Sequence, residues 1–272
     1  MDDWRLIIDP PGDGPENMAT DEALLAGALA GGVCHPTLRV YGWSEPYISI
    51  GCLQDPAPLV PSGLPIVRRP TGGRALIHDV ELTYSIVAGS VDTVFSGGIM
   101  DAYSRISGCI AAALRDVGIG AEFSSARAGY AKTPACFNSS SRYELLVGGR
   151  KIAGSAQRRL KDHFLQHGSI LFGIDRALNA SVFSEGMVEK MTCVSDFSTV
   201  GVEEFRTVLI RRMSEGLDAV FAPGALTGAE TELKARLLRL KYSRREWNLE
   251  TGRSAPANDR AAGLQAGRPG TP

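Results

Sequence analysis

The chain has few cysteines and no excess of charge of one sign. Its five cysteines among 272 residues are widely spaced, odd in number and without a Cys-x-x-Cys pair. That pattern indicates neither a disulfide framework nor a zinc knuckle. The 29 basic and 30 acidic side chains give a formal net charge of -1, so the chain lacks the basic excess that captures nucleic acids or anionic membranes. We therefore expect neither of these partners.

Long hydrophobic runs are also lacking. No apolar stretch reaches the ~18 residues that span a bilayer, and the first residues, Met1 to Arg5, do not form a basic segment followed by an apolar one. These absences predict a cytoplasmic protein. With 44% hydrophobic residues, the chain is long enough to bury a real core, which excludes disorder as its main state.

Helical and strand patterns follow one another without regular alternation. Helices are predicted over residues 17–30, where Asn17 is the expected capping residue, and over residues 100–117, 202–220 and 230–240. Strands are predicted over residues 37–43 and 47–50 as a pair, and over residues 65–69, 82–87, 143–147, 150–155 and 164–172. Gly148 and Gly149 indicate a tight hairpin. Because hairpins outnumber βαβ units, we predict an α+β fold with mixed, mostly antiparallel sheets and flanking helices.

The end of the chain differs in composition from the rest. From about residue 250 it is rich in Ala, Gly, Pro and Arg, and almost no large apolar residue follows Leu264. Such a segment cannot bury enough apolar surface to fold. We expect one domain over residues 1–249 and a disordered tail over residues 250–272.

The most unusual segment is Arg-Arg-Pro-Thr-Gly-Gly-Arg-Ala-Leu-Ile-His-Asp at residues 68–79. Paired glycines let the backbone approach a ligand closely, while Arg69, Arg74 and His78 supply donors for an acyl oxygen or a phosphate. The spacing matches neither common glycine-rich nucleotide-binding pattern. The segment is therefore a ligand loop or a glycine turn with solvated arginines.

One cysteine and one lysine are candidates for chemistry. Cys136 lies in a polar loop of small residues, 132–141, just before the hairpin that carries Lys151. A reactive thiol needs partial exposure and nearby positive charge, whereas most cysteines are small buried hydrophobes. Lys151 is either a solvated hairpin lysine or a charge that lowers the thiol pKa or stabilises an oxyanion.

Other polar residues have structural interpretations. His163 and His167 have the spacing of a metal pair, but they lie on a strand pattern and no glutamate follows His163, so no metal site is predicted. Asp21 and Glu22 are expected in the first turn of a helix rather than in a catalytic dyad. No Gly-x-Ser-x-Gly elbow surrounds Ser155, which disfavours a serine hydrolase.

Several segments in order resemble the biotin/lipoate protein ligase and octanoyltransferase superfamily, up to about residue 248. The similar segments are the opening helix at 17–25, strands at 36–43 and 48–51, the loop at 68–85, the lysine hairpin at 149–157 and the strand at 166–171. Ala135-Cys136-Phe137 followed by Tyr143-Glu144-Leu145 is similar to the cysteine-containing branch, the octanoyl-[acyl carrier protein]:protein N-octanoyltransferases. The segment at 55–63 departs from the family in being shorter and rich in proline.

The resemblance implies a biotin/lipoate ligase-like acyltransferase domain over residues 1–249. Octanoyl-acyl carrier protein would be the donor, and a lipoyl-domain protein, either glycine cleavage H protein or a 2-oxoacid dehydrogenase E2-type domain, the acceptor. No cofactor is implied. Cys136 would form the acyl thioester, and Lys151 would lower its pKa and stabilise oxyanions. The implied substrate-binding residues are Arg69, Thr71, Gly72, Gly73, Arg74, His78, Gly154 and Ser155.

Three alternatives remain open from the sequence. An ATP-dependent lipoate-protein ligase activates a free acid as an acyl-adenylate and would stay active in Cys136→Ala. An octanoyl amidotransferase between lipoyl domains would use the same cysteine intermediate. A non-catalytic acyl- or biotin-binding module would form no covalent adduct, and only the coexistence of Cys136, Lys151 and the loop argues against it.

Overall fold

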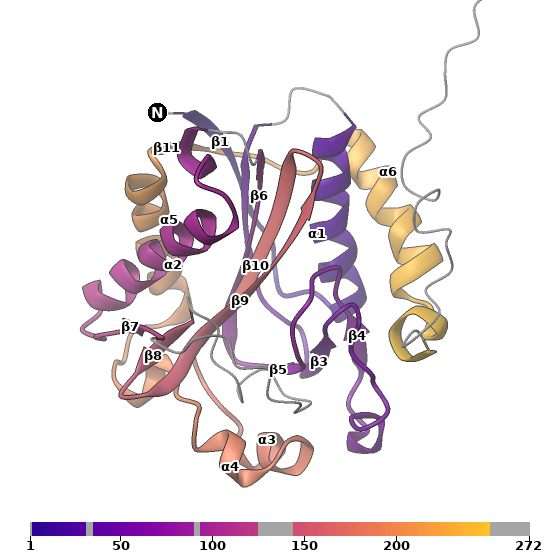
Figure 1. Cartoon of the computed structure of the whole chain (residues 1–272), viewed down its shortest axis with the longest axis vertical. Helices are drawn as coiled ribbons and strands as arrows, with labels where there is room; N and C mark the ends of the chain where they lie inside the picture. The colour runs from indigo at the N-terminus through magenta and orange to yellow at the C-terminus, as the bar shows by residue number, and fades with distance from the viewer. Residues whose placement is uncertain (1, 31–34, 90–92, 125–143, 251–272) are drawn as a thin grey trace, which may run out of the picture.

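The computed structural model describes residues 2–30, 35–89, 93–124 and 144–250. These residues form an eight-stranded sheet of order β11-β1-β2-β6-β10-β9-β8-β7 and a three-stranded sheet of order β4-β3-β5 (Figure 1). The strands are β1 (Asp2–Ile8), β2 (Thr37–Tyr41), β3 (Tyr47–Ile50), β4 (Ile66–Arg68), β5 (Leu76–His78), β6 (Glu81–Gly89), β7 (Glu122–Phe123), β8 (Leu145–Val147), β9 (Arg150–Leu160), β10 (His163–Leu171) and β11 (Ala219–Pro223).

Helices cover both faces of the large sheet. The helices of the described residues are α1 (Gly14–Leu29), α2 (Ile99–Asp116), α3 (Arg176–Val182), α4 (Glu185–Val188), α5 (Val202–Leu217) and α6 (Gly228–Leu237). Figure 1 shows α2 and α5 on one side of the sheet and α1 with α6 on the other. The main core lies under α2 and α5, and a smaller cluster lies under α1.

The predicted fold class is confirmed. Strand β1 pairs in parallel with β2 and β11, and β3 with β4, whereas the remaining ladders are antiparallel. The predicted hairpin is confirmed as well, because Gly148 and Gly149 have φ of 56° and 76° between β8 and β9. Two positive φ values are what a tight two-residue hairpin turn requires.

The expected pairing of residues 37–43 with 47–50 is wrong. Strand β2 pairs with β1 and β6 in the large sheet, while β3 pairs with β4 and β5 in the small one. The Ser-Glu-Pro segment between β2 and β3 therefore carries the chain from one sheet to the other.

Helix α1 begins earlier than expected. Asp13 is its N-cap and accepts a hydrogen bond from the Glu16 backbone N–H at 2.7 Å, with a proline in the first turn. Asn17, predicted as the capping residue, instead lies inside the helix and donates to the carbonyl oxygens of Gly12 and Gly42. Its side chain thereby ties the helix to the segment that follows β2.

Residues 251–272, nearly all of the predicted tail, lie outside the described residues, so the domain boundary stays a prediction. None of the helices in the described ranges is long and apolar enough to cross a membrane.

Candidate active site

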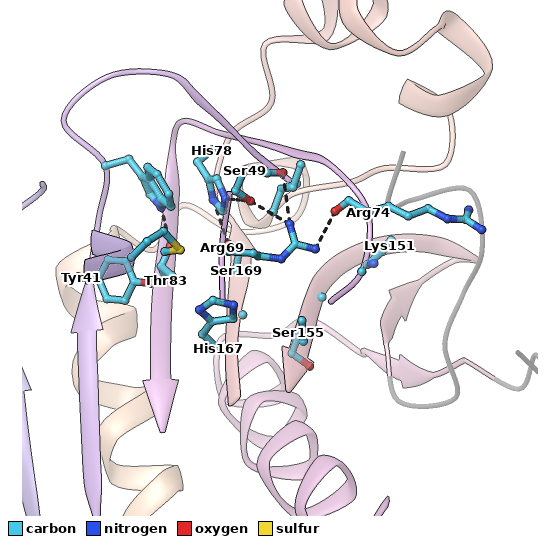
Figure 2. Close-up of a pocket in the computed structure, with 17 residues that line it drawn as sticks. Tyr41, Ser49, Arg69, Arg74, His78, Thr83, Lys151, Ser155, His167 and Ser169 are labelled. Atoms are coloured by element: carbon cyan, nitrogen blue, oxygen red, sulfur yellow. Dashed lines mark hydrogen bonds between the residues drawn. The ribbon is translucent and has the colours of Figure 1, made fainter. Parts of the chain in front are cut away.

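A pocket lies between the two sheets, with a volume of about 540 Å³ that is open to solvent. Its walls come from α1, β2, β3, β5, β6, β9, β10 and the loop between β4 and β5 (Figure 2). The lining residues are Met18, Tyr41, Trp43, Ser49, Arg69, Gly73, Arg74, Leu76, His78, Thr83, Lys151, Gly154, Ser155, Ala156, His167, Gly168 and Ser169.

Behind the pocket, Asp21 is the centre of a buried polar network. Its fully buried carboxylate accepts hydrogen bonds from Arg39 at 2.8 Å, Tyr41 at 2.9 Å and Ser85 at 2.8 Å, and it contacts His167 at 2.9 Å. Burial alone would raise the pKa of Asp21, but the hydrogen bond from His167 and the charge of Arg39 outweigh it and hold the pKa below its ordinary value. The expected first-turn role of Asp21 is wrong, because the residue lies well inside α1.

His167 connects this network to the glycine-containing loop. Burial lowers the pKa of His167, so its imidazole is neutral near pH 7. The Nδ1–H then donates to Asp21, and Nε2 accepts from the Thr71 hydroxyl at 2.7 Å. Thr71 is itself fully buried. The second histidine of the predicted spacing pair, His163, contacts Asp162 instead, and the described residues contain no group of three His, Cys, Asp or Glu side chains that could hold a metal ion.

Arg69 shapes the loop from inside. Its guanidinium donates to the Ser49 carbonyl oxygen at 3.2 Å, to that of Gly72 at 2.8 Å and to that of Arg74 at 2.9 Å. Gly73 has a φ of 96°, and a Cβ there would lie 2.6 Å from the Arg69 guanidinium. The loop conformation therefore depends on a glycine at this position.

His78 is held just as firmly. Nδ1 lies 2.7 Å from Glu81 and Nε2 lies 2.6 Å from the Ser49 hydroxyl, and the ring stacks on Trp43 with centroids 3.8 Å apart. Figure 2 shows the Arg74 guanidinium pointing away from Arg69 and His78, while its carbonyl faces Arg69. These contacts give Arg69 and His78 a role in shaping the pocket, and their contact with a ligand stays a prediction.

Sequence reasoning missed the role of Arg68. This side chain is fully buried and connects residues 51–54 and 247–248 to the start of the loop by hydrogen bonds. Its guanidinium donates to the carbonyl oxygens of Gly51 at 3.1 Å, Cys52 at 3.3 Å, Gln54 at 2.7 Å, Trp247 at 2.8 Å and Asn248 at 3.3 Å. The adjacent arginines thus differ in their contacts, since Arg68 binds carbonyl oxygens outside the loop and Arg69 binds carbonyl oxygens within it.

Lys151 is buried, so the interpretation as a solvated hairpin lysine is wrong. Its side chain is 3% exposed, and Nζ lies 2.6 Å from Oε1 of Glu144. Its backbone N–H donates to the carbonyl oxygen of Lys190, and its own carbonyl accepts from the N–H of Thr192. Its partner Glu144 was not predicted, although this residue lies on the other arm of the same predicted hairpin.

The structure brings most of the predicted site residues together. Those that line the pocket are Arg69, Gly73, Arg74, His78, Lys151, Gly154 and Ser155. Thr71 does not line the pocket but hydrogen-bonds the lining residue His167, and Gly72 is exposed. Cys136 lies in residues 125–143, outside the described residues, so its predicted position beside Lys151 stays a prediction.

The two ends of the pocket differ in chemistry. Figure 2 shows Lys151, Ser155 and Arg74 at one end and Tyr41 with Thr83 at the other. Met18 and Trp43 pack with Tyr41 in one hydrophobic cluster. A ligand with a polar head and an apolar chain fits this arrangement, because the ammonium of Lys151 can meet a carbonyl oxygen while the chain contacts the aromatic end.

Comparison with known proteins identifies the family. Residues 13–214 match the lipoyl protein ligase A/B catalytic domain. The octanoyltransferase LipM of Moorella thermoacetica is 40% identical over 271 residues, covering 90% of this chain and 97% of the relative. That of Carboxydothermus hydrogenoformans is 36% identical over 266 residues, covering 91% and 98%. The chain therefore belongs to the lipoyl protein ligase A/B catalytic domain family.

Solved structures agree with this assignment. A lipoate-protein ligase A bound with ATP superposes with a TM-score of 0.77 at 28% identity, covering 90% of this chain and 98% of the ligase. The bipartite lipoate protein ligase of Thermoplasma acidophilum, described together with its E2 lipoyl domain, gives 0.75 at 26% identity, covering 91% and 96%. The fold and the family thus agree with the resemblance drawn from the sequence.

Proposed function

We propose that this protein is an acyltransferase that moves an octanoyl group from octanoyl-acyl carrier protein to a lysine of a lipoyl-domain protein. The observation that carries the proposal is the buried ammonium of Lys151 at one end of a pocket whose other end is aromatic and apolar. The name octanoyltransferase LipM on relatives that match nearly the whole chain supports the same reaction.

The chemistry runs in two steps through a thioester on Cys136. The thiolate attacks the carbonyl carbon of the donor thioester, the new C–S bond forms, and the C–S bond to the carrier breaks as the carrier thiolate leaves. The acceptor amine then attacks the enzyme thioester, a C–N bond forms, and the C–S bond to Cys136 breaks to regenerate its thiolate. The proton that the amine loses balances the charge of the carrier thiolate, which is released as the thiol. Two easier steps thereby replace one encounter of three large partners.

Within this scheme Lys151 lowers the pKa of the Cys136 thiol and stabilises the oxyanion of each tetrahedral intermediate. Backbone N–H groups around Gly72 and Gly73 are further candidates for oxyanion contacts. The acceptor is glycine cleavage H protein or an E2-type domain, in keeping with the E2 lipoyl domain that accompanies the Thermoplasma acidophilum ligase.

A second candidate is an ATP-dependent lipoate-protein ligase. It is favoured by the superposition with a lipoate-protein ligase A that binds ATP. A ligase would make an acyl-adenylate from a free acid and would not need Cys136. An amidotransferase that takes octanoyl from another lipoyl domain would share the cysteine chemistry and differ only in its donor.

The test is transfer to an unmodified lipoyl domain in the absence of ATP, with octanoyl-carrier protein or an octanoylated lipoyl domain as donor. We expect modification of the acceptor with the carrier donor, loss of activity in Cys136→Ala and retained activity in Cys52→Ala, whose cysteine is half-buried. Modification that requires ATP and a free acid would assign the ligase reaction, and transfer only from the lipoyl domain would assign the amidotransferase.

A further inference from the structure

The ion pair between Glu144 and Lys151 contains a residue to which no role has been assigned. The two side chains are 6% and 3% exposed, and Nζ lies 2.6 Å from Oε1. Within the described residues the Glu144 side chain has no other hydrogen-bond partner, and its Oε2 is buried without one. Burying a carboxylate is costly unless it is paired, and among the described residues Lys151 is the partner that offsets this cost.

An irregularity in the β8–β9 hairpin brings the pair to the pocket. Leu146 pairs with Lys151, but the next pair joins Leu145 with Ala153, so Ile152 is an extra residue on β9. Such a bulge bends the strand and re-aims its side chains. Here Ile152 and Ala153 both enter the main core, while Lys151 and Gly154 on either side of them both line the pocket.

Gly154 supplies the space that the ammonium occupies. A Cβ built at this glycine would lie 2.6 Å from Cε and 2.8 Å from Nζ of Lys151. The lysine side chain therefore lies directly over the backbone of Gly154. Glu144 fixes the end of that side chain, and the backbone hydrogen bonds to Lys190 and Thr192 fix its beginning.

We infer that Glu144 is a positioning residue that holds the Lys151 ammonium over Gly154, where it meets the acyl carbonyl. This inference rests on the proposed function. Glu144 does not touch the substrate in this account and acts only through Lys151. A charged group that must face a developing oxyanion has to be held in place before the reaction, and a displacement of about 1 Å costs on the order of 100-fold in rate.

The test asks whether the effect of Glu144→Gln depends on Lys151, so this substitution is measured in the wild-type and in the Lys151→Met background. The rate of octanoyl adduct formation on the enzyme from octanoyl-carrier protein is followed by mass spectrometry. We expect Glu144→Gln to slow it by about 10- to 100-fold in the wild-type background and to have no further effect in the Lys151→Met background. Glu122→Gln, an exposed glutamate on the neighbouring strand β7, is the matched control and should leave the rate unchanged.

Equal slowing by Glu144→Gln in both backgrounds would overturn the inference, and so would an unchanged rate in the wild-type background. If Glu144→Gln does not fold, Gly154→Ala provides a second test, because its methyl group displaces the ammonium and leaves Glu144 intact. The same slowing is expected, and a wild-type rate would overturn the inference.

A measurement independent of activity separates this inference from the proposed function. Lysine ammonium groups held in buried ion pairs give observable ¹H–¹⁵N correlations. We expect one signal that is absent in Lys151→Met, altered in Glu144→Gln and unchanged in Glu122→Gln. A wild-type enzyme that forms no adduct would refute the proposed function while this signal still reports on the pair. A Lys151 signal that Glu144→Gln leaves unchanged would refute the positioning role.

Discussion

Replacing Asp21 by asparagine should destabilise the protein strongly. The carboxylate faces four donors, from Arg39, Tyr41, Ser85 and His167, at 2.8–2.9 Å. An asparagine oxygen accepts at most two of these hydrogen bonds, and its amide hydrogens face the other donors.

The magnitude follows from breaking a buried ion pair, which typically costs about 3–5 kcal/mol. Arg39 keeps Asp9 at 2.6 Å and Asn17 at 3.0 Å, so its charge is not left without a partner. We therefore expect a loss of about 3 kcal/mol in the free energy of unfolding, out of a total of roughly 5–15 kcal/mol for a domain.

Urea unfolding followed by circular dichroism measures this loss. Asp116→Asn is the matched control, because Asp116 is likewise an aspartate paired with arginine, here with Arg211 and Arg212, but at the surface. Exposed pairs contribute little, so the control should lie close to wild type. A loss for Asp21→Asn no larger than that of the control would refute the assignment of Asp21 as the centre of the network.

Three further predictions concern pH, the loop and the lysine. The pKa of His167 is lowered in the folded state, so the unfolded chain takes up the proton first on acidification. The free energy of unfolding should therefore decrease as the pH falls from about 6.5, by at most about 1.4 kcal/mol per pH unit. Unfolding curves of His167→Gln, measured over the same pH range, should lack this decrease. Gly51→Ala should lower octanoyl transfer, since its Cβ would lie 2.1 Å from the Gly73 carbonyl oxygen; wild-type kinetics in this variant would contradict the proposed role of the loop. Lys151→Ala should slow thioester formation by raising the pKa of Cys136, and an unchanged pH profile for alkylation of Cys136 would argue against that role.

Local patterns predicted much of the fold. Residues 100–117 and 202–220 carry helical periodicity, and the structure places α2 and α5 there, although the second helix ends at Leu217 and Ala219–Pro223 forms β11 instead. The two glycines at 148–149 predicted the hairpin because positive φ is a local property. Strands β1, β5, β7 and β11 were missed, and β1 pairs with β11 across more than 200 residues of sequence, a contact that no local pattern reports.

The candidate site was predicted as a set of residues but not as a geometry. Glycines and arginines in one loop indicated a ligand site, yet the sequence could not show that Arg69 binds backbone carbonyls. The alignment of Lys151 with Gly154 depends on a bulge at Ile152, because the two residues would lie on opposite faces of an undistorted strand. The burial of Asp21 likewise depends on His167, a contact between residues 146 positions apart.

The central claim is a covalent octanoyl thioester on Cys136, and intact-protein mass spectrometry tests it most directly. The purified chain is mixed with octanoyl-carrier protein without ATP, with Cys136→Ala as the control. We expect a hydroxylamine-labile octanoyl adduct on the wild-type chain that is absent from Cys136→Ala. An adduct of equal yield on Cys136→Ala, or no adduct on either chain while ATP and free acid support lipoyl-domain modification, would contradict it.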